Sequence, residues 1–500
     1  MSLSLEFNDL DNVVSRLRST VQDAFQNGTA IDKVEEDLFQ QLMQLGNVLL
    51  GSLFKAMKDG DVGPTLEKNG RTFRRLPEKT KRTYRSIFGN FELERFAYGT
   101  RQSQAQEAVP FDEHLGLPKY SYSLLIESWV GQLSTSESYH EACSKLERIL
   151  KLNIPVDSAE RIVSRLGKVA ASVLESQPPI DFQTEAEILV QTSDNKGVVI
   201  LDEQAKTEPL PVGAPSNTKG PKPNQKRMAC MAGVYTIDKN PRTPEQVLDL
   251  LFHSKDAEPL VGKPPRPANP RYFARLTMVD GQGKQIGKSA EEQAQQWMTS
   301  NTIRRHEQGK TIVVMHDGQP SLWEQSVNYQ EGWDTIDILD LLHVIPRIWD
   351  AGKILEPKSL EKFVRERIWL ILTGGVGLVL MGLRRMTTTR DLTKEQREDM
   401  NKIINYLSNN KSRMDYGVYL SQGLPIATGF IEGACRHVIK DRLERSGMRW
   451  TREGAQSMLS LRCIEASDIW DPLMTEYRVE ALSHHGKRNN YYAELAGTAA

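Results

Sequence analysis

Three carboxylates that are far apart in the sequence could do chemistry together. Glu432 lies in the segment PIATGFIEGACRHVIKDR, residues 425–442, among small and apolar residues, while Asp194 and Asp317 each follow an apolar run. Three carboxylates without His or Cys suit Mg²⁺ or Mn²⁺ rather than zinc. Two such ions about 3.5–4 Å apart can activate an attacking oxygen and stabilise the leaving oxygen of a phosphodiester. The set therefore predicts a two-metal site with these residues as ligands.

Each aspartate also has a simpler interpretation, because Asp-Asn and Asp-Gly pairs are common in turns. Other carboxylates, Asp202, Asp337 and Asp340, lie near the same predicted strands. Asp340, His343 and His437 are candidates for supporting the ligands or the substrate without binding the metal. For His437 a packing role is the simpler interpretation.

The elements that must position these carboxylates follow from hydrophobic periodicity. Residues 186–192 and 198–201 are predicted to be two strands joined by a turn at Asn195-Lys196-Gly197. The other predicted elements are strands at 228–237, 311–315 and 335–339, and helices at 289–306, near 322 and across 343–349.

This order of elements matches the α/β core of a ribonuclease-H-like fold, a mixed five-stranded sheet with flanking helices. The first and fourth strands are neighbours in such a sheet, so Asp194 and Asp317 would meet at one edge. The helix that carries Glu432 would close over that edge, with Thr428 as its N-cap and Gly447 as its stop. A helical insertion at 352–424 would precede this last catalytic helix.

With 500 residues, the chain is expected to form several domains. The proline-rich stretch 255–270 is predicted to be an insertion or linker. The apolar run 368–383 is shorter than the ~20 residues of a membrane-spanning helix and favours a buried helix interrupted at its glycines. The predicted regions are an N-terminal helical region at 1–70, a basic β-hairpin at 71–118, a helix-turn-helix-like region at 119–180, the catalytic core at 181–351 and 425–470 with the insertion at 352–424, and a C-terminal tail at 471–500.

Nucleic-acid binding would have to come from local charge clusters, because the formal net charge is only −1. The hairpin, the second helix of the helix-turn-helix-like pair and the lysine-rich loop before 228 are all basic. Each is either a phosphate-contacting surface or an ordinary solvated or packing element. Arg436 and Lys440 lie four and eight residues after Glu432 and would share its helix face. The predicted DNA-contacting residues are Arg82, Arg85, Arg161, Arg165, Lys219, Lys222, Lys226, Arg227, Arg436, Lys440 and Arg442.

Several passages carry a resemblance to a known family. They are SDNKGV at 193–198, HDG at 316–318, LDLLHVI at 339–345 and above all residues 425–442, which are followed by GMRW at 447–450. In these passages the chain resembles the ISKra-group insertion-sequence transposases of the DDE superfamily, over about residues 80–480. The family pattern has Asp-Gly-Lys-Gly where this chain has Asp194-Asn195-Lys196-Gly197.

The resemblance implies a DNA transposase with a ribonuclease-H-like core that uses two Mg²⁺ or Mn²⁺ ions. It would cleave DNA at the terminal inverted repeats of its own mobile element and join the ends to target DNA. Pairing two DNA ends implies a homodimer or larger assembly. We expect a prokaryotic protein of the cytoplasm, associated with the nucleoid and without a membrane partner.

Two other functions remain open from the sequence. A transposase-derived, sequence-specific DNA-binding protein would keep the fold without the chemistry, and the Asn195 departure favours it slightly. A structure-selective nuclease on the same core would cut without terminal repeats and without strand transfer. The four cysteines are far apart and show no metal-ligand spacing, which is typical of reduced thiols in the cytosol.

Overall fold

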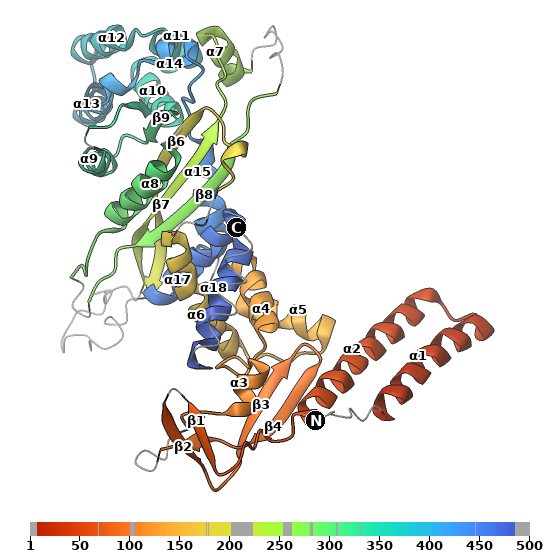
Figure 1. Cartoon of the computed structure of the whole chain (residues 1–500). Coiled ribbons are helices and arrows are strands. Elements are labelled where there is room, and N and C mark those ends of the chain that lie inside the picture. The colour runs from red at the N-terminus through yellow and green to blue at the C-terminus, as the bar shows by residue number, and fades with distance from the viewer. Residues whose placement is uncertain are drawn as a thin grey trace, which may run out of the picture. The chain divides into compact units, whose positions relative to one another are not determined.

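The computed structural model describes residues 8–485 except 69, 101–105, 177, 179, 202–223, 254–262, 281–283, 307–308, 331 and 446. The chain forms two compact units, one of Met1–Val163 with Asp471–Ala500 and one of Ser164–Trp470 (Figure 1). The finer regions expected from the sequence stay predictions.

The smaller unit begins with two helices that pack against each other, α1 (Asn8–Asn27) and α2 (Ile31–Ala56). Phe54 of α2 joins Leu93, Phe111 and Leu117 in a small apolar core. The other elements of this unit are β1 (Thr65–Lys68), β2 (Arg71–Arg75), β3 (Thr80–Ser86), β4 (Gly89–Arg95), β5 (Tyr98–Gly99), α3 (Pro110–Leu115), α4 (Leu124–Ser136), α5 (Tyr139–Leu150), most of α18 (Trp470–Leu482) and the first part of α6 (Val156–Ser176).

The predicted basic hairpin is present as β3 and β4. Ser86 pairs with Gly89, so Ile87 and Phe88 form the turn and Gly89-Asn90 begins the return strand. The Ser86 hydroxyl accepts the Phe88 N–H at 3.1 Å, which closes the turn locally. The predicted pair of helices is also present, and Ser138 and Glu141 form a capping box at the start of α5.

The larger unit is built on a mixed five-stranded sheet in the order β10-β9-β6-β7-β8. β9 and β10 run parallel to β6, whereas β7 is antiparallel to both of its neighbours, β6 and β8. In chain order this is a 3-2-1-4-5 sheet, which is compatible with a ribonuclease-H-like fold. The strands are β6 (Ile188–Leu201), β7 (Asn224–Ile237), β8 (Ala268–Leu276), β9 (Thr311–His316) and β10 (Thr335–Leu339).

The first three strands are not the ones that the sequence pattern indicated. Residues 186–192 and 198–201 do not form a hairpin, because β6 continues through Asn195-Lys196-Gly197 and pairs there with β7. The continuous antiparallel ladder outweighs the local turn propensity of Asn-Lys-Gly. The true third strand, β8, begins inside the stretch expected to be a linker. Pro270 is tolerated there because β8 is an edge strand.

Helices cover both faces of the sheet. Phe273 of β8 stacks on Trp297 of α8 (Ala290–His306), with ring centroids 5.2 Å apart. The preceding residue, Tyr272, stacks at 4.9 Å on Phe430 of α15 (Gly429–Ala434). Successive residues of a strand point to opposite faces. α8 therefore covers one face and α15 the other.

A helical insertion lies between β10 and α15, as expected. The apolar run 368–383 is divided between α11 (Leu360–Leu372) and α12 (Val376–Thr389), and Gly374 supplies the positive φ of the break. Among the described residues, no helix is long and apolar enough to cross a membrane. The other helices of this unit are the rest of α6, α7 (Pro244–Phe252), α9 (Pro320–Tyr329), α10 (Leu341–Leu355), α13 (Lys394–Asn409), α14 (Tyr416–Ser421), α16 (Asp441–Leu443) and α17 (Arg452–Ala466).

Candidate active site at three strand ends

Aspartates stand at the same edge of three neighbouring parallel strands. Ser193 of β6 pairs with His316 of β9, which pairs with Leu339 of β10. The next residue on each strand is an aspartate, and these are Asp194, Asp317 and Asp340. The structure thus brings Asp194 and Asp317 to neighbouring positions, but of their two strands only β9 ends there, because β6 continues past Asp194 to Leu201.

The environment of Asp194 and Asp317 suits a cation. Asp194 Oδ1 accepts the N–H of Asn195 at 2.7 Å, and Asp317 Oδ1 accepts the N–H of Gln319 at 2.9 Å. Burial raises the pKa of Asp317, and the nearby charges of Asp194 and Asp340 raise it further, against the Gln319 N–H and His343. Within the described part of the chain, neither aspartate pairs with a lysine or arginine. Bound Mg²⁺ or Mn²⁺ would relieve this repulsion.

Glu432 belongs to a group with Asp340 and His343, whose candidate ligand atoms lie within 4.8 Å of one another. His343 Nδ1 lies 3.1 Å from Asp340 Oδ2, and its Nε2 lies 3.9 Å from Glu432 Oε1. The hydrogen bond to Asp340 raises the pKa of His343, and the charges of Asp317 and Asp194 add to this. His343 therefore lies close to Asp340 and Glu432 and is also affected by the charges of Asp194 and Asp317.

Asp340 is fully buried and its oxygens are already used. Oδ1 accepts the N–H of Leu342 at 2.8 Å, which caps α10, and Oδ2 contacts His343 and the Thr428 hydroxyl. These bonds connect the end of β10, the start of α10 and the start of α15. Asp340 is thus arranged to hold the site together rather than to bind a metal itself.

The position of Glu432 follows from the packing of Phe430, two residues earlier. The Phe430 ring lies 4.1 Å from the Tyr235 ring and 4.9 Å from the Tyr272 ring. Gly233 leaves room for it, since a Cβ there would lie 2.5 Å from the Phe430 ring. Phe430 with Tyr235, Tyr272 and Gly233 forms an aromatic cluster, called the aromatic seat, which fixes α15 over β7 and β8.

The helix around Glu432 departs from the expected form in three ways. Thr428 precedes the helix but makes no capping bond, because its hydroxyl donates to Asp340 instead. Residues Cys435–Lys440 form a π-helical turn, so offsets of four and eight residues no longer define the Glu432 face. The last helical residue is Leu443 rather than one next to Gly447. Burial raises the pKa of the Cys435 thiol in the π-helical turn, and the charge of the nearby Asp194 carboxylate raises it further.

Several of the predicted DNA-contacting residues are exposed. Arg436 and Lys440 are exposed beyond Glu432, and His437 is exposed as well, with its side chain 73% accessible, so the packing interpretation of His437 is wrong. Arg161 is exposed on α6, and Arg165 is half-buried on the same helix. Lys226 and Arg227 are exposed but belong to β7 rather than to a loop, and Lys219 and Lys222 lie outside the described residues.

One of the predicted DNA-contacting arginines, Arg442, is buried, and two others, Arg82 and Arg85, are partly covered. Arg82 bonds Asp112 at 2.9 Å and the Tyr120 carbonyl at 2.7 Å. Arg442 is 1% exposed and lies over the Trp450 ring. Arg85 lies over the Tyr122 ring. The geometry of Arg82 and Arg442 favours a structural role, and the DNA contact predicted for them stays untested.

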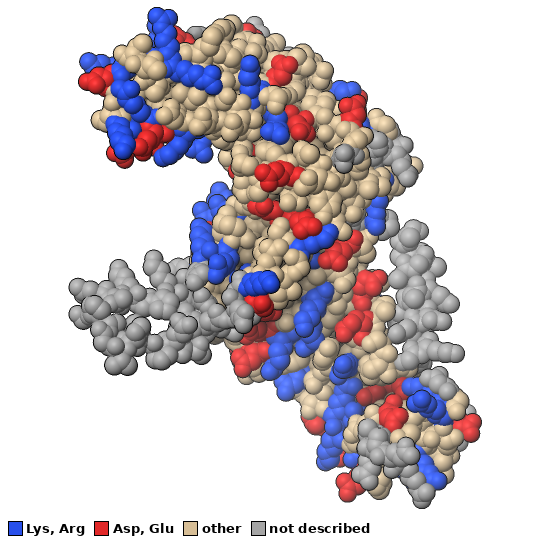
Figure 2. Space-filling view, turned by 90° about the vertical axis from the view of Figure 1, so that its left-hand side faces the viewer, with Lys and Arg blue, Asp and Glu red and all other residues tan. Residues whose placement is uncertain are grey.

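Figure 2 shows further Lys and Arg side chains, mixed with acids, over the helical insertion at the top of the view, where exposed residues include Arg384, Arg385, Lys394, Arg397 and Lys411.

Sequence reasoning assigned no role to His316, which is the last residue of β9 and pairs with Ser193 of β6. Its Nδ1 accepts the N–H of Ser193 at 3.2 Å, and its Nε2 lies 2.8 Å from the Ser326 hydroxyl of α9. These partners imply a proton on Nε2. Burial lowers the pKa of His316 to about 3. A neutral His316 therefore ties together the strands that carry Asp194 and Asp317.

We expect His316 to make the fold acid-sensitive. The unfolded chain binds a proton at this residue below about pH 6.5, whereas the folded chain binds it only near pH 3. Its contribution to stability is therefore present above pH 6.5 and is lost as the pH falls, by about 1.4 kcal/mol per pH unit. Urea unfolding at pH 7 and pH 5 should show a smaller difference in His316→Gln than in the wild type. An equal difference in both proteins would contradict this role.

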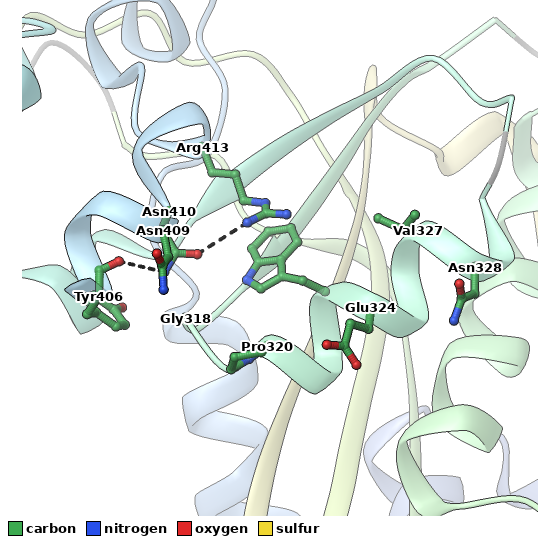
Figure 3. A pocket seen from close by; sticks show the side chains of 10 residues that line it. Gly318, Pro320, Glu324, Val327, Asn328, Tyr406, Asn409, Asn410 and Arg413 are labelled. Carbon is green, nitrogen blue, oxygen red and sulfur yellow. Dashed lines mark hydrogen bonds between the residues drawn. The ribbon is translucent and has the colours of Figure 1, made fainter. Parts of the chain in front are cut away.

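A pocket of about 780 Å³ opens next to Asp317. Figure 3 shows its lining residues, with Pro320 and Glu324 from α9, and Tyr406, Asn410 and Arg413 from the insertion. The Arg413 guanidinium lies 4.0 Å above the Trp323 ring, and Asn410 donates to the Tyr406 carbonyl at 2.9 Å. The pocket therefore gathers aromatic, amide and guanidinium groups beside Gly318, the residue that follows Asp317.

Comparisons with known proteins add little to this geometry. A scan against protein-family models found no match, and a search of curated proteins found none either. A search of solved structures found similarity to the Drosophila P element transposase strand transfer complex, at 10% identity and a TM-score of 0.23, covering 72% of this chain and 82% of that chain. At this TM-score the match says nothing about the fold, and the candidate site is defined by the residues of this chain alone.

Proposed function

We propose that the protein is a metal-dependent DNA transposase of the DDE type, related to the ISKra group of prokaryotic insertion sequences. One observation carries the proposal. Asp194 within β6 and Asp317 just after β9 lie side by side on neighbouring parallel strands of the 3-2-1-4-5 sheet, and the helix with Glu432 packs against the same sheet. The residues quoted for the family resemblance, 193–198, 316–318, 339–345 and 425–442, are the ones that form this edge.

Asp194, Asp317 and Glu432 would hold two Mg²⁺ or Mn²⁺ ions, which supply the Lewis-acid chemistry of phosphodiester cleavage and joining. The nucleophiles would be water in the first step and the freed 3′-hydroxyl of DNA in strand transfer. The protein needs no nucleophile of its own. Burial raises the pKa of the nearby thiols Cys230 and Cys435, which keeps them protonated and unreactive.

The exposed side chains of Arg436 and Lys440, in the π-helical turn that follows the helix with Glu432, would hold the DNA backbone by charge. The substrates would be the terminal inverted repeats of the protein's own element and a target DNA. Pairing two ends calls for a homodimer or larger assembly. Such a protein would act in the cytoplasm, at the nucleoid.

The proposal is tested with a linear DNA fragment that carries the coding region and both of its natural flanks. Incubation of the fragment with purified protein and Mg²⁺ should yield 3′-hydroxyl ends at fixed positions in both flanks, and EDTA should prevent cleavage. Flank DNA that is bound but never cut with Mg²⁺ or Mn²⁺ would instead favour a DNA-binding protein without catalysis. Cuts that do not depend on flank sequence would favour a structure-selective nuclease.

A further inference from the structure

We propose that Glu291 is a positioning residue that holds Asp194 and Asp317 in place from the opposite face of the sheet. The inference rests on the proposed function, because it concerns how the metal-binding edge is kept in shape. Glu291 lies in the first turn of α8, at the N-terminus of that helix, where a negative charge is favoured.

A single oxygen of Glu291 joins the two chain segments that follow the aspartates. Glu291 Oε1 accepts the Asn195 side-chain amide at 2.5 Å and the Gln319 side-chain amide at 2.9 Å. Asn195 is part of β6, and Gln319 lies just beyond β9. The carboxylate thus bridges the middle of β6 and the segment that follows β9.

The same two residues also hold the aspartates directly. The backbone N–H of Asn195 donates to Asp194 Oδ1 at 2.7 Å, and that of Gln319 donates to Asp317 Oδ1 at 2.9 Å. Each aspartate therefore has one oxygen fixed by a residue that Glu291 holds in turn. A fixed Oδ1 leaves Oδ2 of each aspartate to face a cation.

Strand alternation explains why this clamp does not obstruct the site. Asp194 points to the face of α15, where it meets Cys435, whereas Asn195 points to the face of α8. Glu291 can therefore fix the aspartates from the α8 face without entering the α15 face, to which Asp194 points.

Asn195 is the residue at which this chain departs from the Asp-Gly-Lys-Gly pattern of the family it resembles. A glycine at this position has no side-chain amide and cannot reach Glu291. On this basis the departure strengthens the site by adding one arm of the clamp, and it is not a sign of lost activity.

The clamp needs an acceptor oxygen at position 291 but not a negative charge. Glu291→Gln keeps an oxygen that can accept both amides, whereas Glu291→Ala removes it. A residue that binds the metal or supplies charge would be damaged by both changes. Glu292 offers a matched control, because it lies in the same helical turn but contacts Tyr329 and Lys288 instead.

The test is calorimetric titration of Mn²⁺ into the metal-free full-length protein and its variants, with thermal unfolding to confirm that each is folded. Loss of residues that orient metal ligands typically weakens metal affinity about 10–100-fold. We expect Glu291→Ala to weaken Mn²⁺ binding at least about tenfold, and Asn195→Gly to weaken it less. Glu291→Gln and Glu292→Ala should bind like the wild type.

Two results would overturn the inference while the proposed function stands. Glu291→Ala binding Mn²⁺ as tightly as the wild type would remove any role, and Glu291→Gln binding as weakly as Glu291→Ala would assign the effect to charge or ligation. If Glu291→Ala does not fold, Asn195→Gly and Glu291→Gln are each compared with the wild type. Asn195→Gly binding Mn²⁺ as tightly as the wild type, or Glu291→Gln binding it more weakly, would then overturn the inference. A wild-type protein that binds no Mn²⁺ would overturn the proposed function as well.

Discussion

Asp317→Asn is expected to abolish cleavage of the flanking DNA, with a loss on the order of 10³-fold or more, as for other groups that act as a unit in catalysis. The change removes a ligand charge with almost no change in shape. Glu432→Gln should have a similar effect for the same reason. Gel assays of cleavage with Mg²⁺ measure both variants.

Although Asp317→Asn should lose activity, its metal-free form should be more stable than the metal-free wild type. The pKa of Asp317 is raised in the folded protein, so ionising its carboxyl group destabilises the fold. The folded protein therefore loses stability as the pH rises from the pKa that Asp317 has in the unfolded chain to the higher pKa that it has in the folded chain. Removing the charge should therefore raise the melting temperature at pH 7. Added Mn²⁺ should raise the melting temperature of the wild type and leave that of Asp317→Asn nearly unchanged.

Asp334→Asn is the control, because Asp334 is an exposed acid near β10 that has no place in the site. It should cleave DNA and respond to Mn²⁺ like the wild type. Full activity of Asp317→Asn, or an Mn²⁺ response equal to that of the wild type, would contradict its role as a ligand.

Asp340→Ala should be the most destabilising single change at the site, by about 2–4 kcal/mol. The value combines a lost helix cap with buried partners left without a hydrogen bond. Thr428, which donates to Asp340, is 1% exposed and would have no water to replace the lost carboxylate. Urea unfolding at pH 7 measures the loss.

Asp340→Asn separates the structural bonds from the charge. Asparagine also caps helices well, so the loss of stability should be about 1 kcal/mol. The pKa of His343 should nevertheless fall towards its ordinary value, because the bond to Asp340 is the largest cause of its rise. NMR titration of His343 measures this, and an unchanged pKa would show that Asp340 does not control His343.

The parts of the fold that could be predicted from sequence are those fixed by local pattern. β9 and β10 are short apolar runs with clear ends, and the 335–339 prediction matches β10 residue for residue. The start of α8 was indicated by Ser289, whose hydroxyl accepts the Glu292 N–H at 3.1 Å. Asp317 could be placed at the sheet edge because it directly follows such a run.

The parts that could not be predicted depend on long-range pairing. Asn195-Lys196-Gly197 has turn propensity, and only the ladder with β7, absent from any local window, keeps it extended. The seat of Phe430 requires Gly233 and two tyrosines from other strands. The bond between Asn195 and Glu291 spans 96 residues. The clamp and the aromatic seat therefore became visible only in three dimensions.

Strand transfer in vitro tests the central claim most directly. The substrate is a labelled duplex of the natural flank, cut in advance to expose a 3′-hydroxyl at the element end, mixed with a supercoiled plasmid and Mg²⁺. The wild type should join the labelled strand covalently to the plasmid, and Asp317→Asn and Glu432→Gln should not. Absence of joined product with the wild type under Mg²⁺ and Mn²⁺, or equal joining by the variants, would contradict the account.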